Sequence, residues 1–207
     1  MVRHIEIRTY KESDFDDLLS IQKEAFPPPF PEELWWSKQH ISAHVNTFPD
    51  GAMIAYVDGD PAGSATSLIT TLSDEAHSWE EIADDGYITR THVANGDTLY
   101  GIDVCVRPTY RGKGIAAALY DARKQLVRDL GLARYVAGCR IPNYYEYAEQ
   151  MDVATYVEHV VAGDIHDLVL SFMLKQGLHP VRILPNYVED DESLNYAVLV
   201  EWRNDTL

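Results

Sequence analysis

A basic turn that contains two glycines is the part of this 207-residue sequence whose residue types point most directly to chemistry. It reads Arg111-Gly112-Lys113-Gly114 and separates two segments of different periodicity. Because glycine has no side chain, backbone N–H groups in such a turn can approach a ligand closely. The turn also precedes a predicted helix, whose positive dipole end attracts anions. The sequence therefore predicts an anion site here, and phosphate is the expected anion.

The segments on either side of the turn are predicted to be a strand and a helix. Residues 100–106 alternate apolar and polar side chains, with Ile102 and Val104 on one face, as in a half-buried strand. From Lys113 onward, apolar residues recur at three- and four-residue steps, which is typical of an amphipathic helix. Gly131 is the expected end of that helix.

Three kinds of strand–turn–helix phosphate site could explain this pattern. A P-loop requires G-x-x-x-x-G-K-S/T, and neither the spacing nor the hydroxyl is present. A dinucleotide-binding fingerprint is superficially met by Gly112, Gly114 and Ala117. That fingerprint needs an acidic residue about 20 residues later, and the next predicted strand, residues 134–139, offers none.

The third kind is the pyrophosphate loop of the acyl-CoA-dependent N-acetyltransferases, and the segment resembles it closely. The motif of the GNAT superfamily is R/Q-x-x-G-x-G/A after a strand that ends V-x-P. This chain reads Val106-Arg107-Pro108 and then Arg111-Gly112-Lys113-Gly114-Ile115-Ala116. The resemblance implies acetyl-CoA as a co-substrate, with no metal. It places the cofactor contacts at Val104, Cys105, Val106, Arg111, Gly112, Lys113, Gly114, Ile115, Ala116 and Ala117.

The whole chain resembles a GNAT domain. The resemblance implies a single α/β domain over residues 1–207, of the layered α+β kind, with a mixed, mostly antiparallel central sheet of about seven strands flanked by helices. The cofactor-binding core would span about 99–140, and an insertion about 142–164. More narrowly, Ala137-Gly138-Cys139-Arg140-Ile141-Pro142 and the tyrosines after it are similar to the acetyltransferase domain that some bacterial proteins carry beside a carbon–nitrogen hydrolase domain. The other expected elements are a strand at 4–8, helices from Ser13 and from Pro31 to about Val45, a hairpin of 52–57 and 62–69, and strands around 181–184 and 194–202.

The activity that the resemblance implies is direct attack of a primary amine of a small molecule or peptide on acetyl-CoA. Such an amine arrives protonated, so a base must first remove a proton. Asp103 is the candidate base, because it lies beside Val104, whose backbone N–H would hold the oxyanion. A solvated or salt-bridged strand residue is the alternative interpretation of Asp103. A water relay to Glu146 or Glu149 is the competing account of the base.

The residue that would protonate the leaving thiolate is displaced from its usual place. In the family a tyrosine on the helix after the last core strand has this role, and Met173 occupies the matching position here. Methionine donates no useful proton. Tyr145 and Tyr147 in the insertion are the candidate replacements, with packing as their alternative role. Met173 also keeps a second hypothesis open: a non-catalytic module that binds acyl-CoA and reports its level.

Cys105 and the chain's composition bear on the remaining questions. Cys105 could form an acetyl-cysteine intermediate, but an unpaired strand cysteine is usually a small buried hydrophobe. The net charge of −16 argues against a nucleic-acid partner. It fits either a cationic acceptor or an acidic, solvated surface that keeps the protein soluble. There is no export leader and no run of 18 apolar residues, so we expect a cytoplasmic protein with no membrane partner. A homodimer is the assembly that we consider.

Overall fold

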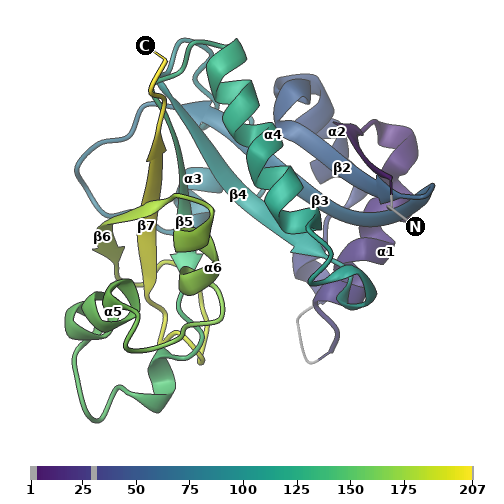
Figure 1. Cartoon of the computed structure of the whole chain (residues 1–207). Coiled ribbons are helices and arrows are strands. Elements are labelled where there is room, and N and C mark those ends of the chain that lie inside the picture. The colour runs from purple at the N-terminus through teal and green to yellow at the C-terminus, as the bar shows by residue number, and fades with distance from the viewer. Residues whose placement is uncertain (1–3, 29–31, 207) are drawn as a thin grey trace.

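Seven strands form one mixed sheet in the computed structural model, which describes residues 4–28 and 32–206 (Figure 1). The sheet order is β1-β2-β3-β4-β5-β7-β6. Only β4 and β5 run parallel, whereas every other neighbouring pair is antiparallel. The expected mixed, mostly antiparallel sheet is therefore confirmed. The strands are β1 Ile5–Thr9, β2 Ala52–Val57, β3 Asp60–Thr70, β4 Thr98–Val106, β5 Arg134–Arg140, β6 His179–Leu184 and β7 Ala197–Arg203.

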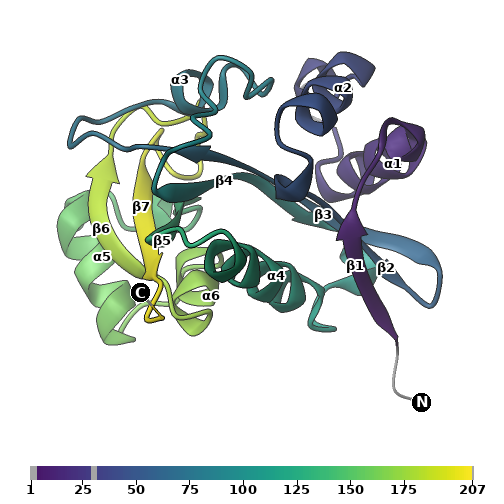
Figure 2. The ribbon, with the colours of Figure 1, turned by 90° about the horizontal axis from the view of Figure 1, so that it is seen from above.

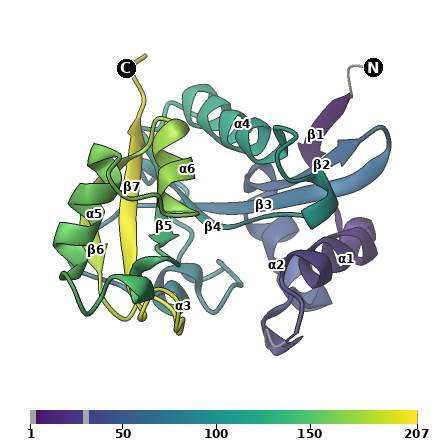
Figure 3. The ribbon, with the colours of Figure 1, turned by 60° about the horizontal axis from the view of Figure 1, so that its bottom comes forward.

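Helices cover both faces of this sheet, as Figure 2 shows from above. One face carries α1, α2 and α3, and we call it the α2 face; the other carries α4 and α6, and we call it the α4 face. Figures 1 and 3 show α5 at the β6 side of the sheet. The helices are α1 Phe15–Ala25, α2 Lys38–Thr47, α3 Trp79–Ala83, α4 Ile115–Asp129, α5 Val153–Ala162 and α6 Leu170–Lys175.

The central strand–turn–helix unit forms as the sequence predicts. A 3-10 turn at Pro108–Tyr110 follows β4, because proline has no N–H with which to continue the strand. Gly114, with φ +85°, precedes the first residue of α4, and Gly131, with φ +65°, follows its end. Ile115 and Leu119 of α4 are buried against the sheet. The turn is thereby fixed at the end of β4 and the beginning of α4.

A β-bulge in β4 changes which side chains face which side. Asp103 pairs with Thr66, but Gly101 pairs with the next residue of β3, Ser67, so Ile102 is an extra residue. Adjacent residues of β3 lie on opposite faces, and therefore Gly101 and Asp103 do as well. The strict alternation predicted for residues 100–106 is wrong across Ile102 for this reason.

Two predicted helix starts are also wrong. Ser13 lies in a 3-10 turn at Glu12–Asp14, and α1 begins at Phe15. Pro31 lies outside the described residues, and α2 begins only after Ser37, whose side chain accepts a hydrogen bond from the His40 N–H at 3.2 Å. The insertion at 142–164 contains a short turn at Tyr144–Glu146 and α5.

Candidate active site

The turn at residues 111–114 is exposed and stands at the N-terminus of the 15-residue α4. Gly112 and Gly114 have φ of +71° and +85°, a region that side chains disfavour. A Cβ added at either glycine would meet no atom within 4 Å, so space for a ligand remains beside the backbone. The first N–H groups of an α-helix have no partner within the helix. The predicted anion site therefore has the exposure, the free donors and the helix dipole that it needs.

The side chain of Arg111 holds this turn in place. Its Nε donates to the carbonyl oxygen of Val106 at 3.3 Å, and one Nη donates to that of Ala25 at 3.4 Å. Ala25 is the last residue of α1, where a cation is favourable to the helix dipole. Arg111 thus joins the end of β4 to the end of α1.

The parallel pair β4–β5 is paired over only half its length. The paired residues are Thr98–Gly101 with 134–137, and beyond them the two strands diverge (Figure 1). We call β4 residues 102–106 and β5 residues 138–140 the open end of the pair. Their backbone groups that do not bond β3 or β7 are available to a ligand that lies between the strands.

The alternation of hydrogen bonds tells which groups of β4 face the open end. The Arg107 N–H donates to the Ala62 carbonyl at 2.9 Å, so this pair bonds across β3 and β4. In an antiparallel ladder every second residue pair is hydrogen-bonded, so the backbone N–H and carbonyl of Cys105, two residues before Arg107, also bond to β3. Val104 lies between bonded pairs, and its N–H therefore points toward the open end. This is the group expected to hold the oxyanion.

Asp103 lies on the α2 face beside this backbone. The residue is partly exposed, but its Oδ2 atom is buried and has no hydrogen-bond partner among the described residues. The buried indole Nε1 of Trp36 also has no partner at hydrogen-bond geometry within the part of the chain that the structure describes. Burial raises the pKa of Asp103 to about 6, while the charge of Arg123 and the Trp36 N–H act to lower it.

A fixed chain of hydrogen bonds supports Thr66, which faces Asp103. The Tyr10 hydroxyl lies 2.9 Å from Thr66 Oγ1 and 2.8 Å from His44 Nδ1, and His44 Nε2 lies 2.6 Å from the Gly86 carbonyl. A carbonyl only accepts, so Nε2 carries the proton, Tyr10 donates to Nδ1, and Thr66 donates to Tyr10. Burial lowers the pKa of His44 to about 4 and so keeps this chain neutral.

Two tryptophans that the sequence analysis did not assign border the bulge. The Trp79 Nε1–H donates to the carbonyl of Ile102 at 2.9 Å, and the rings of Trp36 and Trp79 stack with centroids 6.3 Å apart. Trp79 is the first residue of α3, whose cap at Ser78 is visible in the sequence. No sequence pattern indicates that its side chain reaches the bulge, because 23 residues separate it from Ile102.

Cys105 is a buried free thiol on the same face as Asp103. Its Sγ lies 3.4 Å from the hydroxyl oxygen of Ser64. Burial and the nearby Asp103 charge raise the pKa of the thiol, so it stays protonated at neutral pH. This favours the interpretation of Cys105 as a small buried side chain rather than a nucleophile.

The candidate acids lie in the insertion beyond β5. The Tyr145 side chain is 52% exposed, and the ring of Tyr147 is half-buried, 5.5 Å from that of Tyr156. Met173 is buried on α6, and Glu146 and Glu149 are exposed. The catalytic roles of the two tyrosines stay predictions.

Buried Asp167 anchors this insertion to α6. Its carboxylate accepts hydrogen bonds from the Tyr156 hydroxyl at 2.7 Å, from the Leu170 N–H at 2.8 Å and from the Asn143 N–H at 3.2 Å. These donors come from α5, from α6 and from the start of the insertion. The positions of Tyr145 and Tyr147 therefore depend on Asp167.

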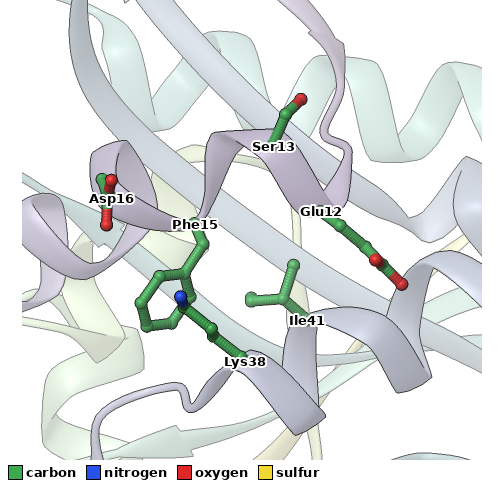
Figure 4. Close-up of a pocket in the computed structure, with 6 residues that line it drawn as sticks. All are labelled: Glu12, Ser13, Phe15, Asp16, Lys38 and Ile41. Carbon is green, nitrogen blue, oxygen red and sulfur yellow. The ribbon is translucent and has the colours of Figure 1, made fainter.

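A separate cavity of about 300 Å³ lies between α1 and α2 (Figure 4). The Nζ of Lys38 sits 5.4 Å from the centroid of the Phe15 ring at this cavity. None of the predicted site residues lines it, so we do not place the reaction there. Its lining residues are Glu12, Ser13, Phe15, Asp16, Lys38 and Ile41.

In residues 4–28 and 32–206, no helix combines the length and the apolar character that crossing a bilayer requires. The same residues contain no group of three or more His, Cys, Asp or Glu side chains that could hold a metal ion.

Comparison with protein families gives a match to the Acetyltransferase (GNAT) family over residues 15–148. The chain belongs to the GNAT acetyltransferase family. A Bacillus subtilis (strain 168) protein named uncharacterized N-acetyltransferase YkwB is 45% identical over 97% of this chain and 89% of its own length. The probable hydrolase YhcX from the same strain is 44% identical over 96% of this chain, which spans only 38% of that longer protein.

Solved structures support the same GNAT fold. The loading GNATL domain of CurA from Lyngbya majuscula superposes with a TM-score of 0.81 at 20% identity, over 97% of this chain and 98% of that one. The GphF GNAT-like decarboxylase, solved with isobutyryl-CoA, superposes with a TM-score of 0.72 at 21% identity, over 96% of this chain and 98% of that one. At these identities, the two structures bear on the fold alone.

Proposed function

We propose that this GNAT protein is an acetyl-CoA-dependent N-acetyltransferase that acetylates a primary amine of a small molecule or peptide by direct attack. The observation that carries the proposal is the position of Asp103. Its carboxyl lies on the α2 face, one residue from the Val104 N–H that points to the open end of β4–β5. The proposed base and the proposed oxyanion donor are thus adjacent residues of one strand.

The exposed turn at residues 111–114 supports acetyl-CoA as the acyl donor. Its backbone donors and the α4 dipole suit a pyrophosphate, and the open end suits the extended arm between pyrophosphate and thioester. GphF, which has the same fold, was solved with a CoA thioester. We therefore assign the pyrophosphate to the turn and the thioester to the neighbourhood of Val104.

The proposed reaction transfers one acetyl group and removes two protons from the acceptor nitrogen. Asp103 takes a proton from the ammonium, directly or through one water, and the amine nitrogen then attacks the thioester carbonyl carbon. The Val104 N–H stabilises the oxyanion of the tetrahedral intermediate. The carbon–sulfur bond breaks, the nitrogen loses its second proton to solvent, and the thiolate takes a proton from Tyr145, Tyr147 or solvent. The products are an amide and CoA.

A non-catalytic acyl-CoA sensor is the second candidate, and Met173 is the observation that favours it. The side chain at this position is buried and donates no proton. A thiolate, however, can leave without being protonated by an acid. In addition, holding the two reactants in place accounts for much of the rate acceleration. We therefore favour the enzyme.

The experiment is a CoA-release assay with acetyl-CoA and a panel of amines: polyamines, amino-sugars, and peptides with free α- or ε-amino groups. We expect release that depends on the amine, with cationic acceptors preferred because the chain carries a net charge of −16. The matched control omits the amine and measures hydrolysis. Tight acetyl-CoA binding with no amine-dependent release from any acceptor would favour the sensor.

A further inference from the structure

A buried arginine lies on the α4 face, directly behind the bulge in β4. Arg123, from α4, is only 1% exposed. Its guanidinium donates to the carbonyl of Thr66 at 2.8 Å, to the hydroxyl of Tyr135 at 2.8 Å, and to the carbonyl of Asp103. Thr66 and Asp103 are the two residues that pair at the bulge. Arg123 therefore joins β3 to β4 at this point, from the face opposite the Asp103 carboxyl.

The neighbouring backbone leaves room for this guanidinium. A Cβ added at Gly101 would lie 2.3 Å from the Tyr135 hydroxyl oxygen and 3.0 Å from an Nη of Arg123. Any larger residue would push the arginine and the tyrosine away from the bulge. Glycine at position 101 is thus required by the close approach of Arg123.

The bulge determines the face on which Asp103 lies. With strict alternation, Asp103 would share the face of Gly101, which is the α4 face. The extra residue Ile102 moves the carboxyl to the α2 face. A side chain that holds the carbonyls of the bulge therefore holds the base in place.

Arg123 also supplies a positive charge that acts on Asp103 from the other side of the sheet near neutral pH. The other titratable groups packed there are Tyr10 from the segment after β1, Cys105 on β4, and His44 on α2, one hydrogen bond beyond Tyr10. Burial raises the pKa values of Tyr10 and Cys105 and lowers that of His44 to about 4. All three are uncharged between about pH 5 and pH 8.

No ion pair within 4 Å joins Arg123 to a carboxylate among residues 4–28 and 32–206. A buried guanidinium without such a partner is costly, and its three hydrogen bonds to neutral oxygens offset only part of that cost. Its charge favours the ionised form of the one carboxyl that it acts on across the bulge, that of Asp103.

We propose that Arg123 is a positioning residue of this site: it holds the bulge that places the Asp103 carboxyl on the α2 face, and its positive charge acts on that carboxyl from the other side of the sheet. The kinetic part of this inference rests on the proposed acetyl transfer. The electrostatic part concerns only the folded protein and can be measured without turnover.

Two substitutions separate the charge of Arg123 from its hydrogen bonds. Arg123→Gln removes the charge but retains an N–H₂ group for a carbonyl, and Arg123→Lys retains the charge but cannot bond both carbonyls and Tyr135. The Asp103 carboxyl is titrated by carbon NMR, with its signal identified by its loss in Asp103→Asn. The pH dependence of kcat/KM and the affinity for acetyl-CoA are measured in parallel.

We expect Arg123→Gln to raise the Asp103 titration midpoint by about one pH unit and to move the rising limb of kcat/KM equally. Arg123→Lys should keep the midpoint and lower kcat by about tenfold, with acetyl-CoA affinity unchanged in both variants. Arg134→Gln is the matched control: Arg134 pairs with Glu201 at 2.8 Å elsewhere in the sheet, so its loss should leave the midpoint unmoved.

An unmoved Asp103 midpoint in folded Arg123→Gln would overturn the inference. Wild-type kcat in folded Arg123→Lys would overturn the positioning part even where Arg123→Gln fails to fold. A wild-type protein without turnover but with a midpoint that moves in Arg123→Gln would contradict the proposed function alone.

Discussion

At the scale of single residues, Asp103 is placed between opposing influences. Burial favours its protonated form, whereas Arg123 behind the bulge and the Trp36 N–H favour the ionised form. The resulting pKa of about 6 suits a base at neutral pH, because most molecules are ionised and the carboxylate is still basic enough to take a proton.

The pH dependence of the rate tests this role. An ionised base is required, so kcat/KM should rise as the pH passes through about 6 in the wild type. Asp103→Asn keeps the shape and removes the base, and we expect a rate about 10²- to 10⁴-fold lower with acetyl-CoA affinity retained. Near-normal turnover of Asp103→Asn would transfer the role to Glu146 or Glu149. Loss of acetyl-CoA binding together with turnover would show that Asp103 is structural.

The same pKa predicts a cost in stability. A carboxyl whose pKa is higher in the folded than in the unfolded protein loses stability as the pH rises from about 4 through about 6. Asp103→Asn should therefore melt higher than the wild type at pH 8, by about 5–10 °C, because two pKa units correspond to about 2.7 kcal/mol. This advantage should be nearly lost at about pH 4, where the folded protein holds the proton and about half of the unfolded chains do. Thermal melts at the two pH values measure it, and an equal difference at both would contradict the raised pKa.

The leaving group gives a further prediction at this scale. If the insertion supplies the acid, Tyr145→Phe or Tyr147→Phe should lower kcat by about 10²-fold with little change in KM. Tyr87→Phe, an exposed tyrosine on the segment after α3, is the control. Steady-state kinetics of the three variants measure this. Wild-type rates in both insertion variants would assign thiolate protonation to solvent.

At the scale of elements, the turn before α4 carries the cofactor assignment. Gly114 and Gly131 flank the same helix, both have positive φ, and a Cβ at either meets nothing within 4 Å. Gly114→Ala and Gly131→Ala should each lower the free energy of unfolding by about 1–2 kcal/mol. Only Gly114→Ala should also weaken acetyl-CoA binding, by at least about tenfold, because it alone approaches the pyrophosphate.

Calorimetric titration with CoA and denaturant unfolding measure the two effects separately. A CoA affinity of folded Gly114→Ala equal to that of the wild type would remove the cofactor from this turn. Equal losses of both affinity and stability would attribute the effect to the helix rather than to contact with the ligand.

Elements whose signal is local could be predicted from the sequence. The bounds of β5 and β2 were readable because turn residues flank short apolar runs, and α4 because its periodicity extends over 15 residues. The bulge could not be predicted. It depends on Arg123, which is 57 residues from Thr66, and on Trp79, 23 residues from Ile102. The candidate base was found from its place beside Val104, and alternation also predicts that it faces opposite to Val104, as the pairing with Thr66 and Ala65 confirms.

At the scale of the whole molecule, the resemblance to the GNAT family could be recognised in the sequence from the strand–turn–helix unit, which is about a fifth of the chain. The acceptor does not follow from that unit, because the walls of the α2 face come from segments before it, such as Trp36 and Trp79. The position of the acid does not follow either, because the insertion separates β5 from α6 and is held by contacts to Asp167.

The central claim is that acetyl passes directly from acetyl-CoA to an amine. Its most direct test is a single-turnover reaction with isotopically labelled acetyl-CoA and the best acceptor from the panel, quenched at intervals and analysed by mass spectrometry of both amine and protein. The account predicts labelled amide in an amount equal to the CoA released, with no label on the protein at any time. Label that accumulates first on the protein, or acetyl-CoA that remains intact while bound, would contradict it.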